Sequence, residues 1–251
     1  MTSDRQFRRE AQSAQGTATD RKMMYWNQEV SPETLPAPDD VVDILFAVEC
    51  RQLPVDHAYA LSEALSRTLP WMSEEPQVAV HSIHVAGSQN GWERPPHGTG
   101  NFIHLSRRTR LSIRAPSHRV EDLLGALPGT RLVVGGCPMT IGAGKVRPLS
   151  RETTLLARYV VTLPDQDEED FLESTTRALA EMGIRVRKAL CGKSTPLETP
   201  TGTLHTRSLL LADLDVEASF ELQRRGLGPN RLMGCGVFIP HKGVDPVSKN
   251  R

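Results

Sequence analysis

Residues 153–163 have the sequence TTLLARYVVTL, and residues 168–182 have the sequence EEDFLESTTRALAEM. The first segment is apolar and rich in β-branched residues, which favours a strand. The second has apolar residues at helical spacing behind a run of acidic residues, which predicts an amphipathic helix. Strands are then expected at 184–193 and 204–212, on either side of a Pro/Gly hairpin at 196–202.

This half of the chain closes with a predicted helix and a short strand. The helix is expected at 215–225, N-capped by Asp213 or Asp215, and the strand at 237–239. The order is therefore β-α-β-β-α-β, which is that of the ferredoxin-like unit.

The N-terminal half repeats this order, although not the residues that form it. Helices are expected at 56–69 and 118–127, and strands at 41–50, 77–85, 102–106, 109–115, 130–134 and 139–141. We therefore expect an α+β chain with two tandem ferredoxin-like (RAMP/RRM-like) domains, at 41–149 and 150–251. Residues 1–40 are polar at first and then proline-rich, and they are expected to form a disordered tail and linker.

Charge is balanced overall but segregated along the chain. The 30 basic residues equal the 30 acidic ones, which by itself argues against a nucleic-acid-binding protein. However, residues 94–120 contain six arginines and no acidic residue, and residues 129–151 and 184–196 are also basic without an acid. This segregation predicts a basic face on a neutral protein. The alternative is that the segregation disappears on folding.

A glycine-rich stretch, GLGPNRLMGCG, occupies residues 226–236 and precedes the last predicted strand. Glycine lets a ligand approach the main chain closely, and exposed N–H groups beside Arg224, Arg225 and Arg231 would form an anion cradle. The stretch is not a dinucleotide-binding motif, because it leads into a strand instead of linking a strand to a helix. The alternative is a glycine-rich turn that only closes a sheet.

Basic residues elsewhere are further candidates for phosphate contacts. Arg107, Arg108 and Arg110 form a predicted basic turn, for which the alternative is a solvated edge-strand run. Arg185 and Arg187 are expected on one face of a strand, with Lys188 beside them, and the same two interpretations apply.

Histidine is the side chain best suited to proton transfer near neutral pH, and the chain has eight. His57 stands at the opening of the first predicted helix, near its free N–H groups, and Tyr59 could assist it. The alternative is an exposed residue at a helix start. His81 and His84 are expected on opposite faces of a strand, so no metal site is predicted.

Two lysines and the cysteines complete the set of candidates. Lys145 ends IGAGK, which fails the P-loop pattern but could stabilise transition-state charge, and Lys242 could contact phosphate. The four cysteines lack a CxxC pair, which is typical of reduced thiols without zinc. No apolar run approaches the ~18 residues of a membrane helix, and no signal peptide is evident, so we expect an intracellular protein without a membrane partner.

Four stretches in combination resemble a known family. They are ELQRRGLGPNRLMGCGVFIPHK (221–242), FAVECRQLPVDHAYALSEALSRTLPWM (46–72), HLSRRTRLSIRAP (104–116) and KVRPLSRETTLLARYVVT (145–162). They are similar to the CRISPR repeat-processing endoribonucleases of the RAMP superfamily, in the Myxococcus-type branch. The resemblance covers roughly residues 41–247.

The resemblance implies cleavage of CRISPR precursor RNA within its repeats, without a metal or other cofactor, in a prokaryotic cytoplasm. The 2′-hydroxyl would attack the phosphate and leave a 2′,3′-cyclic phosphate. His57 would be general base or acid, and Lys145, Arg231 or Lys242 would stabilise the phosphorane. The implied partners are the repeat stem-loop, the mature guide RNA and other subunits of an interference complex. The expected RNA contacts are Arg107, Arg108, Arg110, Arg185, Arg187, Lys188, Arg224, Arg225, Gly226, Gly228, Arg231, Gly234 and Gly236.

Two other functions fit less well. A RAMP protein could hold guide RNA without cutting it, although the histidine at the family's catalytic place argues against this. A cyclic phosphodiesterase or RNA ligase of similar doubled fold needs two His-x-Ser/Thr motifs, and only His104-Leu-Ser106 fits.

Overall fold

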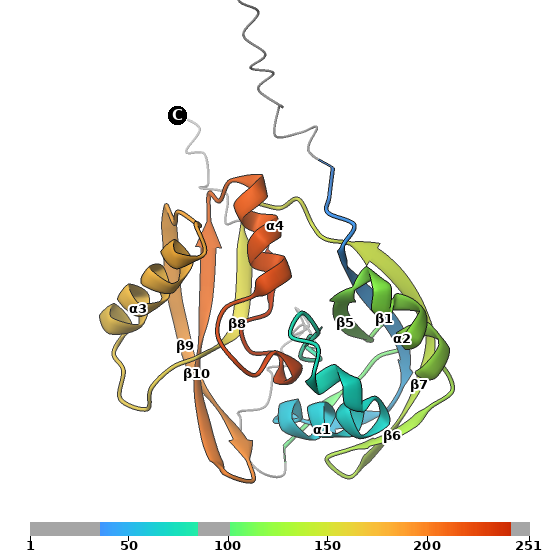
Figure 1. Ribbon diagram of the computed structural model, residues 1–251. Helices are drawn as coiled ribbons and strands as arrows, with labels where there is room; N and C mark the ends of the chain where they lie inside the picture. The colour runs from blue at the N-terminus through green and yellow to red at the C-terminus, as the bar shows by residue number, and fades with distance from the viewer. Residues whose placement is uncertain (1–35, 85–100, 242–251) are drawn as a thin grey trace, which may run out of the picture. The chain divides into compact units, whose positions relative to one another are not determined.

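Strand β1 (Val41–Glu49) lies at the centre of the first sheet in the computed structural model, which describes residues 36–84 and 101–241 (Figure 1). The sheet has the order β3-β5-β1-β7-β6, and every pairing in it is antiparallel. The other strands are β3 (Ala79–Val80), β5 (Arg110–Pro116), β6 (Arg131–Val134) and β7 (Cys137–Pro148).

Alternation along β1 separates two faces of this sheet. Ile44 and Phe46 are fully buried in a core that also contains Leu61 and Leu65 of α1 (Ala58–Thr68) and Leu123 of α2 (Val120–Ala126). Both helices therefore cover the same face, as the period of two in a strand requires. Short helical turns, η2 (Pro70–Ser73) and η3 (Ser117–Arg119), precede or follow them, and β2 (Gln52–Pro54) pairs with β4 (Phe102–His104) in a separate small sheet.

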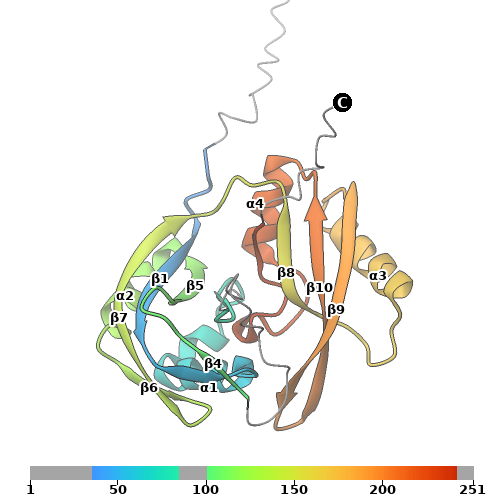
Figure 2. The same cartoon turned by 180° about the vertical axis from the view of Figure 1, so that it is seen from behind.

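The second sheet is built from the C-terminal half of the chain (Figure 2). Its elements follow one another as β8, α3, β9, β10, α4 and β11, and its strand order is β11-β8-β10-β9. The fold is therefore α+β. The bounds are β8 (Leu155–Val161), α3 (Glu168–Glu181), β9 (Lys188–Thr199), β10 (Gly202–Ala212), α4 (Val216–Arg225), η4 (Arg231–Met233) and β11 (Phe238–Pro240).

A small apolar cluster joins the two halves. Ala58 of α1 is buried together with Tyr159 of β8, Leu197 of β9 and Met233 and Cys235 of the glycine-rich stretch. The start of α1 is thereby held against the segment that the sequence singles out as functional.

The predicted elements are present, with several corrections in their bounds. The strand expected at 139–141 is the longer β7, Cys137–Pro148, and β9 continues to Thr199, through most of the hairpin expected at 196–202. The strand expected at 77–85 is only Ala79–Val80. The strand expected at 184–193 begins at Lys188, so Arg185 and Arg187 do not share a strand face as predicted. Gly183 ends α3 in a left-handed conformation and Ile184 donates back to Leu179, which turns the chain before it can extend.

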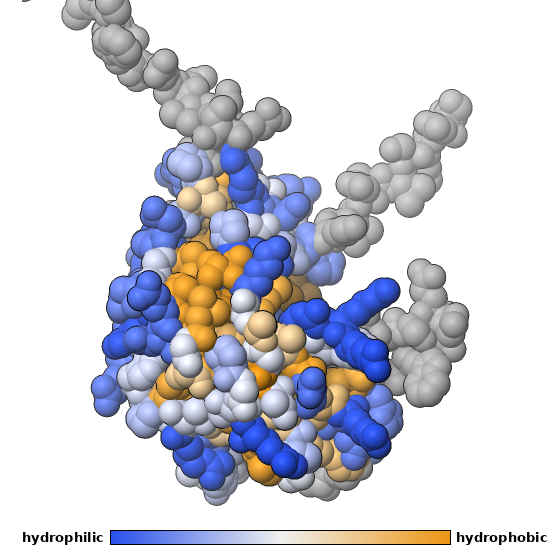
Figure 3. All heavy atoms as spheres, turned by 90° about the vertical axis from the view of Figure 1, so that its right-hand side faces the viewer, coloured by the Kyte–Doolittle hydropathy of each residue, from blue (hydrophilic) through white to orange (hydrophobic). Residues whose placement is uncertain are grey.

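Charged and apolar side chains are interspersed on the side of the molecule that lies to the right in Figure 1, as Figure 3 shows. Val133 on β6 and Val146 on β7 are exposed to 59% and 40%. None of the helices in residues 36–84 and 101–241 has the length and apolar content of a membrane span. All four cysteines are free.

Candidate active site

His57 is the N-cap residue of α1, and its side chain is only 2% exposed. Its Nδ1 lies 2.9 Å from the carbonyl oxygen of Pro54, and the backbone N–H of Ile83 donates to Nε2 over 3.1 Å. Because Nε2 accepts a hydrogen bond, the proton of the neutral ring is on Nδ1. His57 is thus much more buried than a residue at a helix start was expected to be.

The residue before His57 ties the same helix start to the second half of the chain. Asp56 accepts a hydrogen bond from the backbone N–H of Glu198, in β9, at Oδ2 over 2.7 Å. Its other oxygen, Oδ1, is buried and has no hydrogen-bond partner among the residues that the structure describes. Together with the packing of Ala58, this contact fixes the position of His57 beside the β9–β10 hairpin and the glycine-rich loop, residues 226–236.

The glycine-rich loop needs its glycines for conformation and for space. Gly226, Gly228, Gly234 and Gly236 all have positive φ angles, between 64° and 83°. A Cβ atom on Gly236 would stand 1.9 Å from the carbonyl oxygen of Leu227, and one on Gly226 would stand 2.5 Å from that of Gly236. Two backbone N–H groups that were expected to face an anion make hydrogen bonds inside the protein instead. The N–H of Leu227 donates to the carbonyl oxygen of Gly236, and the N–H of Gly236 donates to that of Tyr159.

Arg231 does not project from this loop as the anion-cradle prediction supposed. Its guanidinium donates to the carbonyl oxygens of Arg224, over 2.9 Å, and of Arg225, at the C-terminal end of α4. Burial lowers the pKa of Arg231 to about 10, so it stays charged at neutral pH. A cation here is stabilised by the negative end of the helix, which gives Arg231 a capping role inside the protein.

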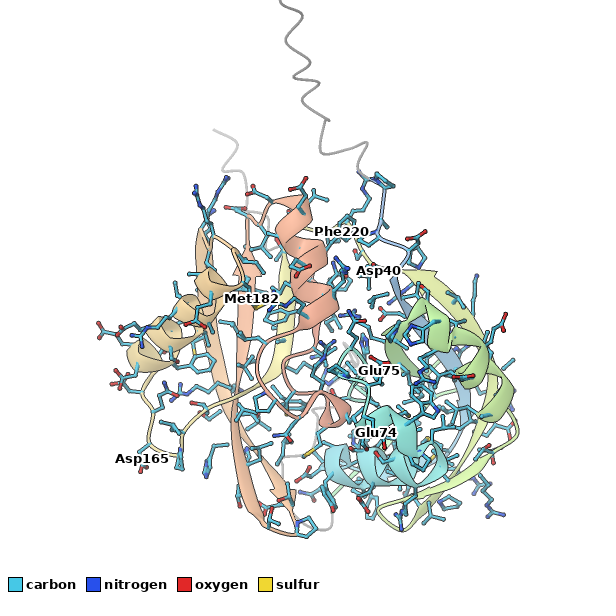
Figure 4. All side chains as sticks on the ribbon, viewed as in Figure 1. Asp40, Glu74, Glu75, Asp165, Met182 and Phe220 are labelled. Atoms are coloured by element: carbon cyan, nitrogen blue, oxygen red, sulfur yellow. The ribbon has the colours of Figure 1, made fainter. Side chains whose placement is uncertain are left out.

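The two arginines before the loop also have acidic neighbours. Arg224 pairs with Glu221 and with Asp40, which is labelled beside α4 in Figure 4. Arg225, which is exposed, pairs with Glu221 over 3.4 Å. Residues 223–244 contain no acid, but Glu221 and Asp40 stand next to these arginines in the folded chain.

Further candidates lie in the turn before β5, on β7 and at the start of β9. Arg107 and Arg108 form the predicted exposed turn before β5, and Lys145 is exposed on β7 in register with Leu45 of β1. Arg187 and Lys188 pair with Asp215 and Asp213, over 3.4 and 2.8 Å. Lys242 lies outside the described residues.

Tyr59 lies on the side of α1 that faces the glycine-rich loop. It lines a groove of about 500 Å³ together with Ser62 of α1, Met72 of η2, and Asn230 and Met233 of the loop. Tyr59 is half-buried there, and it packs against the apolar cluster around Ala58.

A small basic pocket lies between the two sheets. It has a volume of about 170 Å³, and none of the residues that line it within 36–84 and 101–241 is an acid. His81 and His84 both line it, although they were expected on opposite faces, because residues 81–84 are not a strand. The other lining residues are Ser82, Arg110, Ser112, Arg158, Gly234, Val237 and Ile239.

Arg158 was not identified from the sequence. The available signal was a single charge inside the apolar strand segment LLARYVV, since a buried strand rarely carries an arginine without a partner. Its position among histidines, serines and a second arginine suits a phosphate-sized anion. Within residues 36–84 and 101–241, no three His, Cys, Asp or Glu side chains gather as a metal site would require.

A buried acid borders this pocket and was also missed. Asp43 of β1 lies 3.2 Å from Nε2 of His81 and 2.8 Å from Nε of Arg114. Burial by itself would raise the pKa of Asp43, but the charge of Arg114 and the hydrogen bonds from His81 and Arg114 hold it well below its usual value. Burial lowers the pKa of His81, against the opposing effect of Asp43, so His81 is neutral at pH 7.

The chain matches a family model described as Cas6 Crispr over residues 42–243. The chain belongs to the Cas6 family. The CRISPR-associated endonuclease Cas6 of Myxococcus xanthus (strain DK1622) is 32% identical over 199 residues, which are 79% of this chain and 81% of that protein. The family resemblance inferred from the sequence is thereby confirmed, and the chain is a CRISPR-associated endonuclease of this family.

Solved structures share the fold of this Cas6 protein at low sequence identity. A CRISPR associated protein Cas6 aligns with a TM-score of 0.54 and 12% identity, over 81% of this chain and all of that chain. A Cas6-related protein from Pyrococcus furiosus aligns with a TM-score of 0.54 and 14% identity, over 79% and 98% of the two chains.

Proposed function

We propose that this Cas6 protein cleaves CRISPR precursor RNA within its repeats, without a metal, and gives mature guide RNAs. Family membership supports the substrate class. The observation that carries the assignment of a site is the position of His57, at the N-cap of α1 beside the glycine-rich loop. We further propose that residues 41–149 and 150–251 are two ferredoxin-like domains, since the C-terminal half has the required element and strand order.

In the proposed reaction, the 2′-oxygen of the scissile nucleotide attacks phosphorus and the bond to the 5′-oxygen breaks. The 2′-hydroxyl proton passes to Nε2 of His57, and a second acid protonates the leaving 5′-oxygen. Tyr59, Lys145 and Lys242 are candidates for the second acid or for phosphorane stabilisation. The products are a 2′,3′-cyclic phosphate and a 5′-hydroxyl.

Proton transfer requires a change around His57, because its Nε2 lone pair accepts the N–H of Ile83. Residues 81–84 contact His57 through Ile83, while His81, Ser82 and His84 line the basic pocket. An RNA phosphate held by Arg110 and Arg158 in that pocket would touch this segment directly. RNA binding would thus move Ile83 away from His57 and free the Nε2 lone pair for proton transfer.

The proposed RNA contacts extend from this pocket over neighbouring basic surfaces. Arg107 and Arg108 would contact the repeat stem-loop, which is recognised largely by shape. The glycine-rich loop would hold RNA 5′ of the cut. The product would then stay bound and enter an interference complex with other subunits.

A second candidate function is RNA holding without cleavage. The observation that favours it is that His57 is 2% exposed and that both of its ring nitrogens lie within hydrogen-bonding distance of backbone groups. A buried, satisfied histidine of this kind is compatible with a purely structural role.

A single 2′-deoxy substitution at the scissile nucleotide tests the reaction. The repeat RNA is incubated with the protein in EDTA, and the ends of the products are analysed. Cleavage of the all-ribose RNA with a 2′,3′-cyclic end, and none of the substituted RNA, is the expected result. Equal cleavage of both RNAs would contradict 2′-hydroxyl attack, and tight binding without cleavage would favour the holding function.

A further inference from the structure

Arg114 of β5 is the largest fully buried side chain among the described residues, at 0% exposure. Its Nε donates to Oδ1 of Asp43 over 2.8 Å and its Nη2 to Oδ2 over 3.2 Å, which is a bidentate pair between adjacent strands. Only a paired arginine is tolerated at such a depth, because an isolated charge there is strongly destabilising.

The third nitrogen of Arg114 contacts the other half of the protein. Nη1 donates to the carbonyl oxygens of Gln223, over 2.7 Å, and of Phe238, over 3.0 Å. Gln223 lies in the last turn of α4, just before the glycine-rich loop, and Phe238 begins β11, just after it. One nitrogen on the first sheet therefore holds both flanks of the loop.

The same network reaches the segment that connects the two halves. The side chain of Gln223 donates to the carbonyl oxygen of Ser150 over 2.7 Å and accepts the N–H of Ser150 over 3.0 Å. The backbone carbonyl oxygen of Gln223 is the one that accepts a hydrogen bond from Nη1 of Arg114. Moving Arg114 would consequently disturb the loop flank and the connecting segment together.

We propose that Arg114, neutralised by Asp43, is a positioning residue that sets the glycine-rich loop against the first sheet. Arg114 is fully buried, so it acts through the carbonyl groups of Gln223 and Phe238, on either side of residues 226–236. The consequence for RNA cleavage rests on the proposed function, whereas the consequence for loop order does not.

The test replaces the pair by apolar residues, Asp43→Leu with Arg114→Met, in the full-length chain. Replacing both charges avoids an unpaired buried charge, and such exchanges are often neutral for stability. The matched control is the exposed pair on α3, Glu173→Leu with Arg177→Met, whose side chains are 2.7 Å apart. Both proteins are studied by amide hydrogen exchange and by single-turnover cleavage at saturating RNA.

Exchange within residues 226–236 should become at least tenfold faster in the Asp43/Arg114 variant, with exchange in β8 and β10 unchanged. Its cleavage rate at saturating RNA should fall at least tenfold, beyond any change in the control. Unchanged exchange in the loop, or a cleavage rate equal to that of the control, would overturn the proposal. If wild type does not cleave, the exchange measurement alone decides the proposal.

Arg114→Lys serves as the second variant in case the double replacement does not fold. Lysine keeps the charge near Asp43 but cannot make the bidentate pair and reach both carbonyl groups. The same faster exchange in residues 226–236 is expected, and exchange at the wild-type rate would overturn the proposal.

Discussion

At the scale of single residues, the glycines of the loop differ in why a larger residue would be unfavourable at each position. Both Gly228 and Gly236 have positive φ, but only Gly236 faces a backbone atom where its Cβ would stand. Gly228→Ala should cost roughly 1–2 kcal/mol for its backbone conformation alone. Gly236→Ala should cost roughly 3 kcal/mol or more, because Leu227 must also move.

Thermal unfolding of the two glycine variants measures this difference. About 2–4 °C is expected per kcal/mol for a chain of this size, so Gly236→Ala should lower Tm clearly more than Gly228→Ala. Equal Tm values for both variants would contradict the prediction that a side chain at position 236 collides with Leu227.

The pKa of the partly buried His81 predicts a loss of stability in mild acid. Its pKa is lowered in the folded state, so the unfolded chain binds the additional proton as pH falls below about 6.5. The free energy of unfolding should therefore fall between pH 7.5 and 5.5, and it should fall less in His81→Gln. Urea unfolding at the two pH values measures this; identical losses in both proteins would contradict it.

Asp43 acts with the same sign at lower pH. Its pKa is held below the unfolded value, so its contribution to stability is present above about pH 4 and is lost as pH falls further. Urea unfolding at pH 4.5 and 3 should show a smaller loss in the Asp43→Leu with Arg114→Met variant than in wild type. An equal loss in the two proteins would contradict this account of the pair.

Residue patterns predicted where a side chain lies along a helix or strand better than they predicted what surrounds it in the folded protein. His57 could be placed at a helix start because Pro54 and Asp56 precede a run of helical spacing. Its burial could not be predicted, since His57 contacts Ile83, and the neighbouring Ala58 packs in one cluster with Met233 and Cys235, all distant in sequence. For the same reason Arg231 was predicted to bind an anion, although the folded loop places its guanidinium against the C-terminal end of α4.

At the scale of elements, the start of α1 and the β9–β10 hairpin are linked by Asp56. Asp56→Ala removes the acceptor of the Glu198 N–H and should raise the exchange rate of that amide about tenfold. Asp56→Asn keeps an oxygen at this position and should change it much less. Hydrogen exchange followed by NMR measures both; unchanged exchange at Glu198 in Asp56→Ala would contradict the link.

Strands and helices with regular apolar spacing could be predicted, and segments shaped by contacts could not. The residues of α3 and β8 carry their own pattern, so their bounds agree closely with prediction. Residues 81–84 were assigned to a strand as the end of the segment 77–85. The N–H of His81 still donates to Ser112 of β5, but the N–H of Ile83 donates to the side chain of His57, so the strand ends at Val80.

At the scale of the whole molecule, a net charge of zero is compatible with basic surfaces, and these differ in how far acidic side chains already pair with them. Arg107 and Arg108 lie at an exposed turn, whereas Arg187 and Lys188 already pair with Asp215 and Asp213. Arg107→Ala with Arg108→Ala should weaken RNA binding and reduce the salt slope by about 0.7 for each lost phosphate contact. Arg187→Ala with Lys188→Ala should have a smaller effect.

RNA binding at several salt concentrations measures these slopes in both double variants. A larger change for Arg187 and Lys188 than for Arg107 and Arg108 would contradict the proposed RNA surface. The order of the two effects, which the neutral net charge could not predict, follows from the ion pairs of the folded protein.

Cleavage of the cognate repeat RNA under single-turnover conditions in EDTA tests the central claim most directly. Wild type is compared with His57→Ala and with His104→Ala, which replaces an exposed histidine on β4. His57→Ala should slow cleavage roughly 10²–10⁴-fold with little loss of RNA affinity, while His104→Ala should cleave like wild type. Cleavage by His57→Ala at the wild-type rate would contradict the assignment of His57 as the acid–base residue.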